Sequence, residues 1–517
     1  MIRRFTLRCA LILAIAIASI APAFAQDAGQ VLRLSVGYGT MKNTPSLMAK
    51  LTPETKAEVE RLEKMARAAN SEQKYGDALK HLYHAMALMR GMEWTPATAL
   101  TPALTAKLDR QLLDPGDTVS LKVGQIYALD EKPTGKITGS IVLLKMKGDD
   151  LVKELKTIDA IDPNFFAQPL VVQFAIPEVE TGNYRVALRL KLAAGDPVVK
   201  YATVHIERGL AADFAAAKAR TAKIEAALKS KHQDALAAAV PSAAYRISLF
   251  DLARGGDINF ERIDFREALK EANSMLDSLA AGTDPLAARR GEFKKAYKSS
   301  VDNTLQPYQM FVPSSYDKSK SFPLIIALHG MGGDENSYFA AYGQGAFKTE
   351  AEKHGYIVAC PKGRKPTSMY VGDAEKDVMD VLAEVQRAYN IDPDRIYLTG
   401  HSMGGFGTWS VAMNHPEVFA ALAPISGGSE NPANMSKIAH IPQLIVHGDN
   451  DPTVPVARSR AMVEAGKKLG TEIKYIEVPG GDHGSVVAPN FPVVFDWFDS
   501  HKKKAGVAAG AATSPKN

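Results

Sequence analysis

Cysteine is almost absent from this sequence, which has only two, Cys9 and Cys360, among 517 residues. Cys9 lies in a leader that we expect to be removed, and a single remaining cysteine cannot form an intrachain disulfide. The folded chain must therefore be held together by its hydrophobic cores. A chain of this length is too long for a single core, so about three domains are expected.

Surplus charge is scarce as well. Without the leader arginines Arg3, Arg4 and Arg8, the formal net charge of +5 falls to +2. So small a positive net charge gives no reason to expect nucleic acid or an anionic membrane as a partner. No stretch after the leader is long and apolar enough to span a membrane. The sequence also lacks His-Glu-x-x-His and a Walker phosphate loop, so no metal and no other cofactor is expected.

The first 25 residues form a predicted signal peptide. Arg3, Arg4 and Arg8 precede an apolar run over residues 10–21, and a small-x-small cleavage pattern ends at Ala25. The run is short for a membrane anchor, which is the alternative, and the paired arginines leave a twin-arginine route open. We expect a secreted or periplasmic protein that is cleaved near Ala25.

The period of the apolar residues changes twice before residue 300. Helical spacing predicts a hairpin over 44–95, and alternating runs separated by turn residues over 102–208 predict a β-sandwich that resembles an immunoglobulin-like domain. The sandwich is expected to be a binding or homo-oligomerisation module, or a spacer. The predicted order is signal peptide 1–25, helical hairpin 44–95, immunoglobulin-like β-sandwich 102–208, helical connector 209–300, catalytic domain 301–501 and disordered tail 502–517.

From about residue 301 onward, buried strands alternate with helices, a pattern typical of an α/β fold. The continuous apolar run Phe322–Leu328 is expected of a central parallel strand buried on both faces. It ends in the glycine-rich loop His329–Gly333. Because the carboxyl ends of parallel strands face the ligand crevice, this loop is expected beside a functional site.

The strongest functional signal is a Gly-x-Ser-x-Gly pattern around Ser402. The apolar run Ile396–Leu398 leads into residues 400–404 (Gly-His-Ser-Met-Gly), and a helix-length segment follows. Strand, tight turn and helix are the context in which this pattern marks an exposed serine nucleophile. Glycine allows the turn to close because a Cβ there would collide with neighbouring backbone. Chance alone can supply the pattern, so catalytic partners are required.

An acid and a histidine follow this serine, each just beyond a predicted strand. They are Asp451 and His483, and the order serine, acid, histidine is that of the α/β-hydrolase triad. A histidine can accept the serine proton and return it, and a carboxylate fixes the tautomer of that histidine. Asp449 is the rival acid, although it is better placed to cap a turn. Ser402, Asp451 and His483 are therefore the predicted catalytic residues of an α/β-hydrolase domain.

Two backbone N–H groups are predicted to form the oxyanion hole. That of Met403 comes directly after the nucleophile, and that of Met331 lies in the glycine-rich loop. Tyr338, Tyr370 and Trp409 are candidate substrate-binding residues, with ordinary packing as the alternative for each.

Four motifs in the last 200 residues together resemble one branch of the α/β-hydrolases, the feruloyl/acetylxylan-esterase and polyhydroxybutyrate-depolymerase-like branch. They are Leu328–Gly333, Asp392–Tyr397, Gly400–Trp409 and His447–Pro455. The resemblance implies a secreted serine carboxylic-ester hydrolase that forms an acyl-serine intermediate on esters of carbohydrate or phenolic acids. It also implies an immunoglobulin-like domain ahead of the catalytic one, as in some bacterial members. The chain departs from secreted depolymerases in lacking a cysteine pair.

Two other functions remain open from the sequence. The same motifs resemble serine peptidases of the prolyl-oligopeptidase type, although nothing before residue 300 predicts a propeller. The second alternative is a non-catalytic binding protein that binds its partner through the β-sandwich. The expected partner is a small ester or an ester-decorated polysaccharide, and a homo-oligomer through the β-sandwich is a further expectation.

Overall fold

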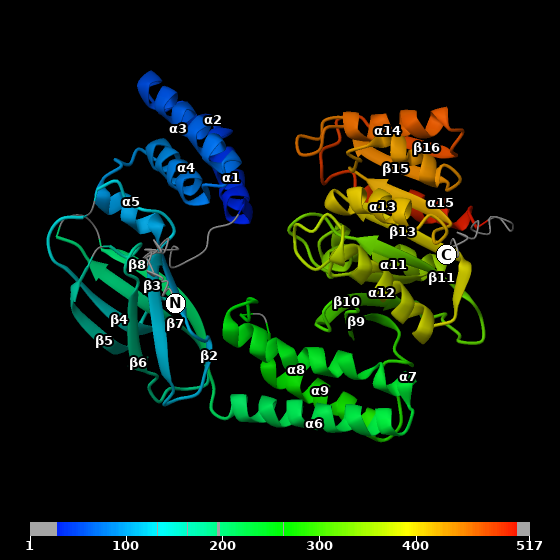
Figure 1. Ribbon diagram of the computed structural model, residues 1–517, viewed down its shortest axis with the longest axis horizontal. Helices are drawn as coiled ribbons and strands as arrows, with labels where there is room; N and C mark the ends of the chain where they lie inside the picture. Colours follow the sequence, from blue (N-terminus) through cyan, green and yellow to red (C-terminus); the bar gives the residue numbers. More distant parts are fainter. Residues whose placement is uncertain (1–27, 132, 163, 194–196, 262, 504–517) are drawn as a thin grey trace, which may run out of the picture. The chain divides into compact units, whose positions relative to one another are not determined.

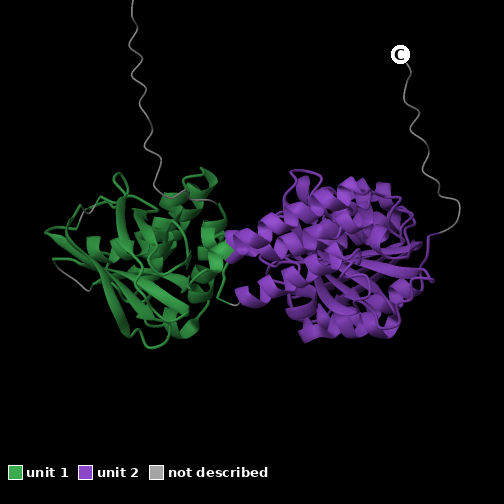
Figure 2. Ribbon diagram, turned by 90° about the horizontal axis from the view of Figure 1, so that it is seen from below, with its two compact units in different colours: residues 1–212, 252–262 green, residues 213–251, 263–517 purple. Residues whose placement is uncertain are grey.

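The computed structural model describes residues 28–131, 133–162, 164–193, 197–261 and 263–503. The chain divides into two units, shown in different colours in Figure 2. Unit 1 comprises residues 1–212 and 252–262, and unit 2 comprises residues 213–251 and 263–517. The predicted signal peptide and residues 504–517 of the predicted tail lie outside the described residues. Within the described ranges, no helix is both long and apolar enough to cross a bilayer.

Helices form the first part of unit 1 (Figure 1). They are α1 (Ala28–Lys42), α2 (Pro45–Met48), α3 (Pro53–Ser71), α4 (Tyr75–Met89) and α5 (Pro96–Ala103). The side chain of Thr52 caps α3 by accepting from the N–H of Thr55, and Pro53 suits its first turn. Val59 and Leu62 of α3 share a buried cluster with Leu82 of α4, so α3 and α4 pack together inside the range predicted as a hairpin. Helix α1 was not expected from the sequence.

Two sheets follow in unit 1. One has the order β1-β3-β6, and the other has the order β2-β8-β7-β4-β5. The strands are β1 (Leu104–Leu108), β2 (Leu112–Leu113), β3 (Thr118–Gln125), β4 (Ile137–Lys145), β5 (Leu151–Ile161), β6 (Leu170–Ala175), β7 (Gly182–Lys191) and β8 (Val198–Ile206). All pairs are antiparallel except β2 with β8. Leu121 of β3 and Leu188 of β7 lie in one shared core, while the immunoglobulin-like assignment stays a prediction.

Helices follow these sheets in the chain and precede the large sheet of unit 2. They are α6 (Leu210–Ser230), α7 (Asp234–Ala237), α8 (Val240–Gly255) and α9 (Phe265–Ala280). The boundary between the two units falls within α6 and within α8. One amphipathic face of α9 buries Leu269, Leu276 and Leu279, as its helical spacing requires.

The catalytic domain of unit 2 is built on one sheet with the strand order β16-β15-β14-β13-β11-β12-β10-β9. Its strands are β9 (Gly291–Lys298), β10 (Leu305–Val312), β11 (Phe322–Leu328), β12 (Ile357–Pro361), β13 (Ile391–His401), β14 (Ala421–Ile425), β15 (Gln443–Gly448) and β16 (Ile473–Val478). Strand β10 pairs antiparallel with β9 on one side and with β12 on the other, and the six strands from β11 to β16 pair with one another in parallel. Leu324, Ile325 and Ile326 of β11 are fully buried, which agrees with a strand covered on both faces.

Helices cover both faces of this sheet (Figure 1). They are α10 (Ser337–Ala340), α11 (Ala346–His354), α12 (Asp373–Ala388), α13 (Met403–Asn414), α14 (Ala457–Lys468) and α15 (Phe491–Asp499), with short 3₁₀ turns at Gly343–Gly345, Pro432–Ile438 and Ala488–Asn490. Phe347 of α11 and Phe495 of α15 pack in one cluster with Ile325 and Val358 of the sheet. The carboxyl ends of the parallel strands therefore meet at one edge, where a site can form.

Strand β9 differs from the sequence expectation. Residues 291–298 lie in the range expected to be a helical connector, yet they form the edge strand of the catalytic sheet. Phe293 and Ala296 are buried and pair with Met310 and Pro307 of β10. An edge strand with two neighbouring lysines has a weak local signal, and antiparallel pairing with the next strand, β10, specifies its conformation.

Candidate active site

Ser402 stands on a sharp turn between β13 and α13. Its backbone has φ +57° and ψ −118°, a conformation that a residue with a side chain rarely adopts. Its N–H donates to the carbonyl of Ile425 at the end of β14, at 2.9 Å. The strand, the strained turn and the helix are the nucleophile elbow expected from the sequence, and the strain is held by the packing around it.

Glycine is required on both sides of this turn. A Cβ on Gly400 would lie 2.2 Å from the carbonyl oxygen of Gly404, and one on Gly404 would lie 1.9 Å from that of Leu328. Both obstacles are backbone atoms, so no side chain can move aside. The elbow can approach β11 this closely only because these positions lack side chains.

We expect Gly404→Ala to destabilise the catalytic domain by roughly 3 kcal/mol, because the added methyl group forces the elbow away from Leu328. Thermal and urea unfolding measure the loss. Gly484→Ala is the matched control, since an added Cβ there meets nothing within 4 Å, and it should change stability by less than about 1 kcal/mol. Equal stability of the two variants would contradict the close approach.

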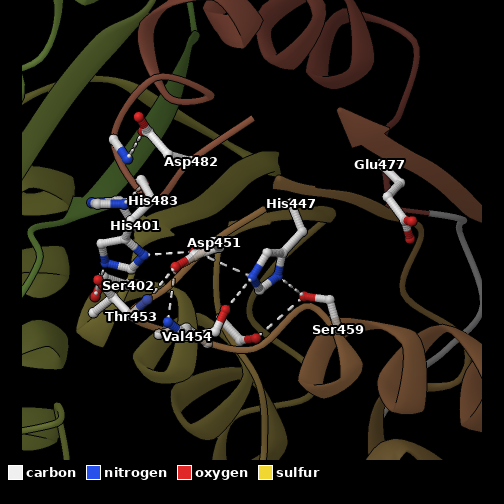
Figure 3. A network of polar contacts seen from close by, with 12 residues as sticks. His401, Ser402, His447, Asp451, Thr453, Val454, Ser459, Glu477, Asp482 and His483 are labelled. Atoms are coloured by element: carbon white, nitrogen blue, oxygen red, sulfur yellow. Dashed lines mark hydrogen bonds and ion pairs between the residues drawn. The ribbon is translucent and has the colours of Figure 1, made fainter. Parts of the chain in front are cut away.

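A chain of hydrogen bonds joins Ser402, His483 and Asp451 (Figure 3). His483 Nε2 lies 2.9 Å from Ser402 Oγ, and His483 Nδ1 lies 2.7 Å from Asp451 Oδ2. His483 comes from the loop after β16, and Asp451 comes from the loop after β15. The tertiary fold thus brings the three residues predicted from the sequence into one line, in the geometry of a nucleophile, a base and an orienting acid.

The Asp451 carboxylate is held on both oxygens. Oδ1 accepts from the N–H of Thr453 at 2.8 Å and from that of Val454 at 2.9 Å. Burial by itself would raise the pKa of Asp451, but the bonds from His483 and from these two N–H groups outweigh it and lower the pKa. The Asp451 carboxyl is therefore ionised and fixed in position opposite His483.

The rival Asp449 does not reach the histidine. Its Oδ1 accepts from the N–H of Gly480 at 2.6 Å and so ties the loop after β15 to the turn after β16. Asp482 likewise accepts from the N–H groups of Gly484 and Ser485, as expected of a turn residue. Neither side chain competes with Asp451 for the position beside His483.

A second buried histidine supports Asp451. The Nε2 atom of His447 lies 2.9 Å from the carbonyl oxygen of Val454 and 3.4 Å from Asp451 Oδ2, and its Nδ1 lies 2.7 Å from Ser459 Oγ. Burial lowers the pKa of His447, so this ring is neutral near pH 7. It packs the acid loop in place without adding a charge.

A relay through Tyr342 and His401 links the glycine-rich loop to the loop of the catalytic histidine. The N–H of Gly330 donates to the Tyr342 hydroxyl at 3.1 Å, and that hydroxyl lies 3.1 Å from His401 Nδ1. His401 Nε2–H donates to the carbonyl of His483 at 2.8 Å. Burial, with a contribution from the His483 charge, lowers the pKa of His401 to about 4 and keeps this ring neutral. No local sequence pattern indicates this link, because its residues come from separate segments of the chain.

We expect Tyr342→Phe to lower kcat about ten-fold with little change in KM, because Gly330 and His401 each lose a partner and the two loops lose their common anchor. The rate of ester hydrolysis, measured over a range of substrate concentrations up to saturation, gives kcat and KM for each variant. Tyr316→Phe is the matched control: its hydroxyl also accepts a backbone N–H, from Asn390, but takes no part in the relay. If both variants keep the kcat of the parent, the relay has no positioning role.

The two predicted oxyanion donors come from the elbow itself and from the glycine-rich loop after β11. The N–H of Met403 is at the first turn of α13, where helical N–H groups have no intrahelical acceptor. The N–H of Met331 has no hydrogen-bond acceptor among the described residues, whereas those of Gly330, Gly332 and Gly333 all have one. Both N–H groups are thus available to a substrate oxygen.

The three aromatic substrate-binding candidates lie in the core rather than on the site. Tyr338 and Tyr370 are 0% exposed and Trp409 is 1% exposed. Trp409 Nε1 donates to Gln443 Oε1 at 2.8 Å, and the ring of Tyr338 packs edge-on against Phe347. Their rings give the site its rigid support, and sequence spacing alone could not separate that role from substrate contact.

Exposed apolar side chains occur on two neighbouring loops of unit 2. Met331 is 48% exposed and Val371 is 53% exposed. The loops are joined where the N–H of Gly332 donates to the carbonyl of Pro366 at 2.9 Å. Among the described residues, no group of His, Cys, Asp or Glu is arranged to hold a metal ion.

Comparisons with known proteins match the same part of the chain. A family model described as PET hydrolase-like matches residues 374–494. The chain is 33% identical over 147 residues to a bifunctional acetylxylan esterase/xylanase of Neocallimastix patriciarum, which covers 28% of this chain and 21% of that protein. It is 28% identical over 226 residues to a protein described as probable feruloyl esterase C of Aspergillus terreus. The match covers 40% of this chain and 80% of that protein.

A third relative is a poly(3-hydroxyalkanoate) depolymerase C of Paucimonas lemoignei, 31% identical over 135 residues, or 23% of this chain and 31% of that one. The chain therefore spans only a minor part of the bifunctional enzyme and of the depolymerase. Among solved structures, a thermostable esterase aligns at a TM-score of 0.38 and 17% identity, over 76% of this chain and 100% of that one.

The sheet order and the three residues at its strand ends define the class as a serine hydrolase with the α/β-hydrolase fold. In its last part the chain is similar to carboxylic-ester hydrolases, among them an acetylxylan esterase, a feruloyl esterase and a poly(3-hydroxyalkanoate) depolymerase. The resemblance predicted from the four motifs is confirmed to this extent.

Proposed function

We propose that this protein is an exported esterase that acts on carbohydrate-linked or phenolic-acid esters through an acyl-Ser402 intermediate. The hydrogen-bonded line from Asp451 through His483 to Ser402 carries the proposal. His483 takes the proton of Ser402 as its Oγ attacks the ester carbonyl, and the N–H groups of Met331 and Met403 stabilise the oxyanion. His483 then protonates the leaving alcohol. In the second half of the reaction, a water molecule gives its proton to His483 and attacks the acyl-serine carbonyl, which releases the acid and restores Ser402.

The acyl group is proposed to rest on Met331 and Val371, the exposed apolar side chains of the two loops that the hydrogen bond from Gly332 to Pro366 joins. An apolar surface beside the nucleophile suits an aromatic acyl group better than a charged one. The names of the relatives, which include an acetylxylan esterase and a feruloyl esterase, favour the same substrate class. The predicted homo-oligomer has no support among the described residues.

A panel of substrates tests this function. Methyl ferulate, acetylated xylan, p-nitrophenyl esters of increasing chain length and a peptide anilide are compared by kcat/KM. We expect methyl ferulate or acetylated xylan to be turned over at least about a hundred-fold faster than the anilide. A preference for the anilide would favour a serine peptidase instead. Absence of any turnover, together with absence of labelling by a fluorophosphonate, would favour a binding protein.

A further inference from the structure

Unit 1 contains a surface pocket that is remote in sequence from the catalytic residues. Its volume is about 380 Å³, within the general size range of small-ligand sites. Three segments line it: residues 106–108 of β1, residues 201–203 of β8 and the loop 256–261, with Gln111 between them. The pocket thus lies where strands of the two sheets of unit 1 approach each other.

The loop is fastened to the sheets by specific contacts. The N–H of Gln111 donates to the carbonyl of Arg254, and the carbonyl of Gln111 accepts from the N–H of His205, both at 2.9 Å. Phe260 is 3% exposed and anchors the loop from beneath. The pocket is therefore a defined feature of the fold rather than a gap beside a loose loop.

An exposed aromatic ring forms one wall of this pocket. Tyr201 on β8 is 49% exposed, although exposed large aromatic side chains are uncommon in this chain. The Arg185 guanidinium lies over this ring at 5.7 Å and is itself held by Asp149, at 2.7 Å. Because these contacts orient the ring before any ligand binds, little side-chain entropy is lost on binding.

Polar side chains surround the ring and are partly pre-oriented. Thr203 Oγ1 donates to Glu261 Oε1 at 3.1 Å, and Asn259 Oδ1 accepts from the N–H of Glu261 at 2.9 Å. Since its oxygen is engaged, Asn259 presents its NH₂ group as a donor. Gln111 adds an amide and Asp257 adds a carboxylate.

We propose that this pocket binds a neutral oligosaccharide chain. The C–H groups on one face of a pyranose ring pack well against an aromatic ring, and its hydroxyls can both donate to carboxylates and accept from amide N–H groups. The lining carries two carboxylates, Asp257 and Glu261, and one cation, Lys107, while the nearby Arg185 is paired with Asp149, so the pocket disfavours phosphates and acidic sugars. The inference does not depend on the ester activity, since binding can be measured without turnover.

Titration calorimetry with xylohexaose and cellohexaose on the full chain tests this site, with Ser402→Ala as the background to prevent turnover. We expect Tyr201→Ala to weaken binding of the preferred hexaose about ten-fold or more, and Tyr201→Phe to keep it within about three-fold. Asn259→Ala should also weaken it. Val171→Ala, at a side chain 58% exposed on β6, is the matched control and should bind as the background does.

In the chain with intact Ser402, Tyr201→Ala should leave the rate of p-nitrophenyl acetate hydrolysis unchanged. This measurement therefore tests the proposed glycan site separately from the proposed esterase activity. Binding that survives both Tyr201→Ala and Asn259→Ala places the glycan elsewhere and overturns the proposal. Absence of binding to either hexaose, or tighter binding of a hexagalacturonate, also overturns it.

Discussion

Ser402→Ala should lower kcat on methyl ferulate and on p-nitrophenyl acetate by about 10⁴-fold or more. The Oγ atom of Ser402 lies 2.9 Å from His483 Nε2, which is in turn oriented by Asp451, and so it is the group placed to form the acyl intermediate. Its removal leaves only the oxyanion donors and substrate binding. Because Ser402 is small and 8% exposed, the variant should unfold at the temperature of the parent.

Labelling with a fluorophosphonate provides an independent check on this prediction. The parent should incorporate one probe and lose activity in proportion, and Ser402→Ala should incorporate none. Retention of even a tenth of the parental kcat in the purified variant would remove Ser402 from the mechanism. Full inactivity accompanied by an unfolded circular dichroism spectrum would instead reflect loss of structure, and thermal unfolding separates the two results.

Asp451→Asn should lower kcat by about 10³- to 10⁴-fold while leaving the fold intact. An asparagine oxygen can still accept from the N–H groups of Thr453 and Val454, so the loop keeps its shape. Its amide cannot replace the charge that stabilises the imidazolium of His483, and its NH₂ favours the wrong tautomer. Most of the loss should therefore appear in kcat rather than in KM.

Asp449→Asn is the matched control for this substitution. Asp449 stands two residues away on the same loop, but its carboxylate binds the N–H of Gly480 rather than His483. An asparagine oxygen can keep that bond, so activity should stay within about three-fold of the parent. If Asp449→Asn proved the more damaging change, the acid of the triad would have been assigned wrongly.

The aromatic candidates show where prediction from the sequence stopped. Tyr338 and Tyr370 lie in the segments 331–345 and 362–376, which are expected to shape the substrate pocket, and Trp409 follows the elbow. All three lie in the core because the helices and loops that carry them turn these rings toward the sheet. Side-chain direction depends on packing between elements, which no local pattern reports.

The relay through Tyr342 and His401 was hidden for a related reason. Gly330, Tyr342, His401 and His483 come from four segments separated by many residues, and each residue alone looks ordinary. Helix α1 and strand β9 were missed because contacts with other elements, the α3–α4 pair for α1 and strand β10 for β9, specify their conformation rather than intrinsic propensity. The pocket beside Tyr201 likewise joins β1, β8 and a loop more than 50 residues later.

The sequence by itself determined the alternation of strands and helices after residue 301, the elbow around Ser402 and the chain order of Ser402, Asp451 and His483. These features follow from local patterns, since apolar period, glycine placement and strand ends are written within a few residues of each other. Only the tertiary structure decided that Asp451 rather than Asp449 contacts His483, and that the candidate rings are buried. Those outcomes depend on distances between segments far apart in the chain, which are set when the sheet closes and its loops pack together.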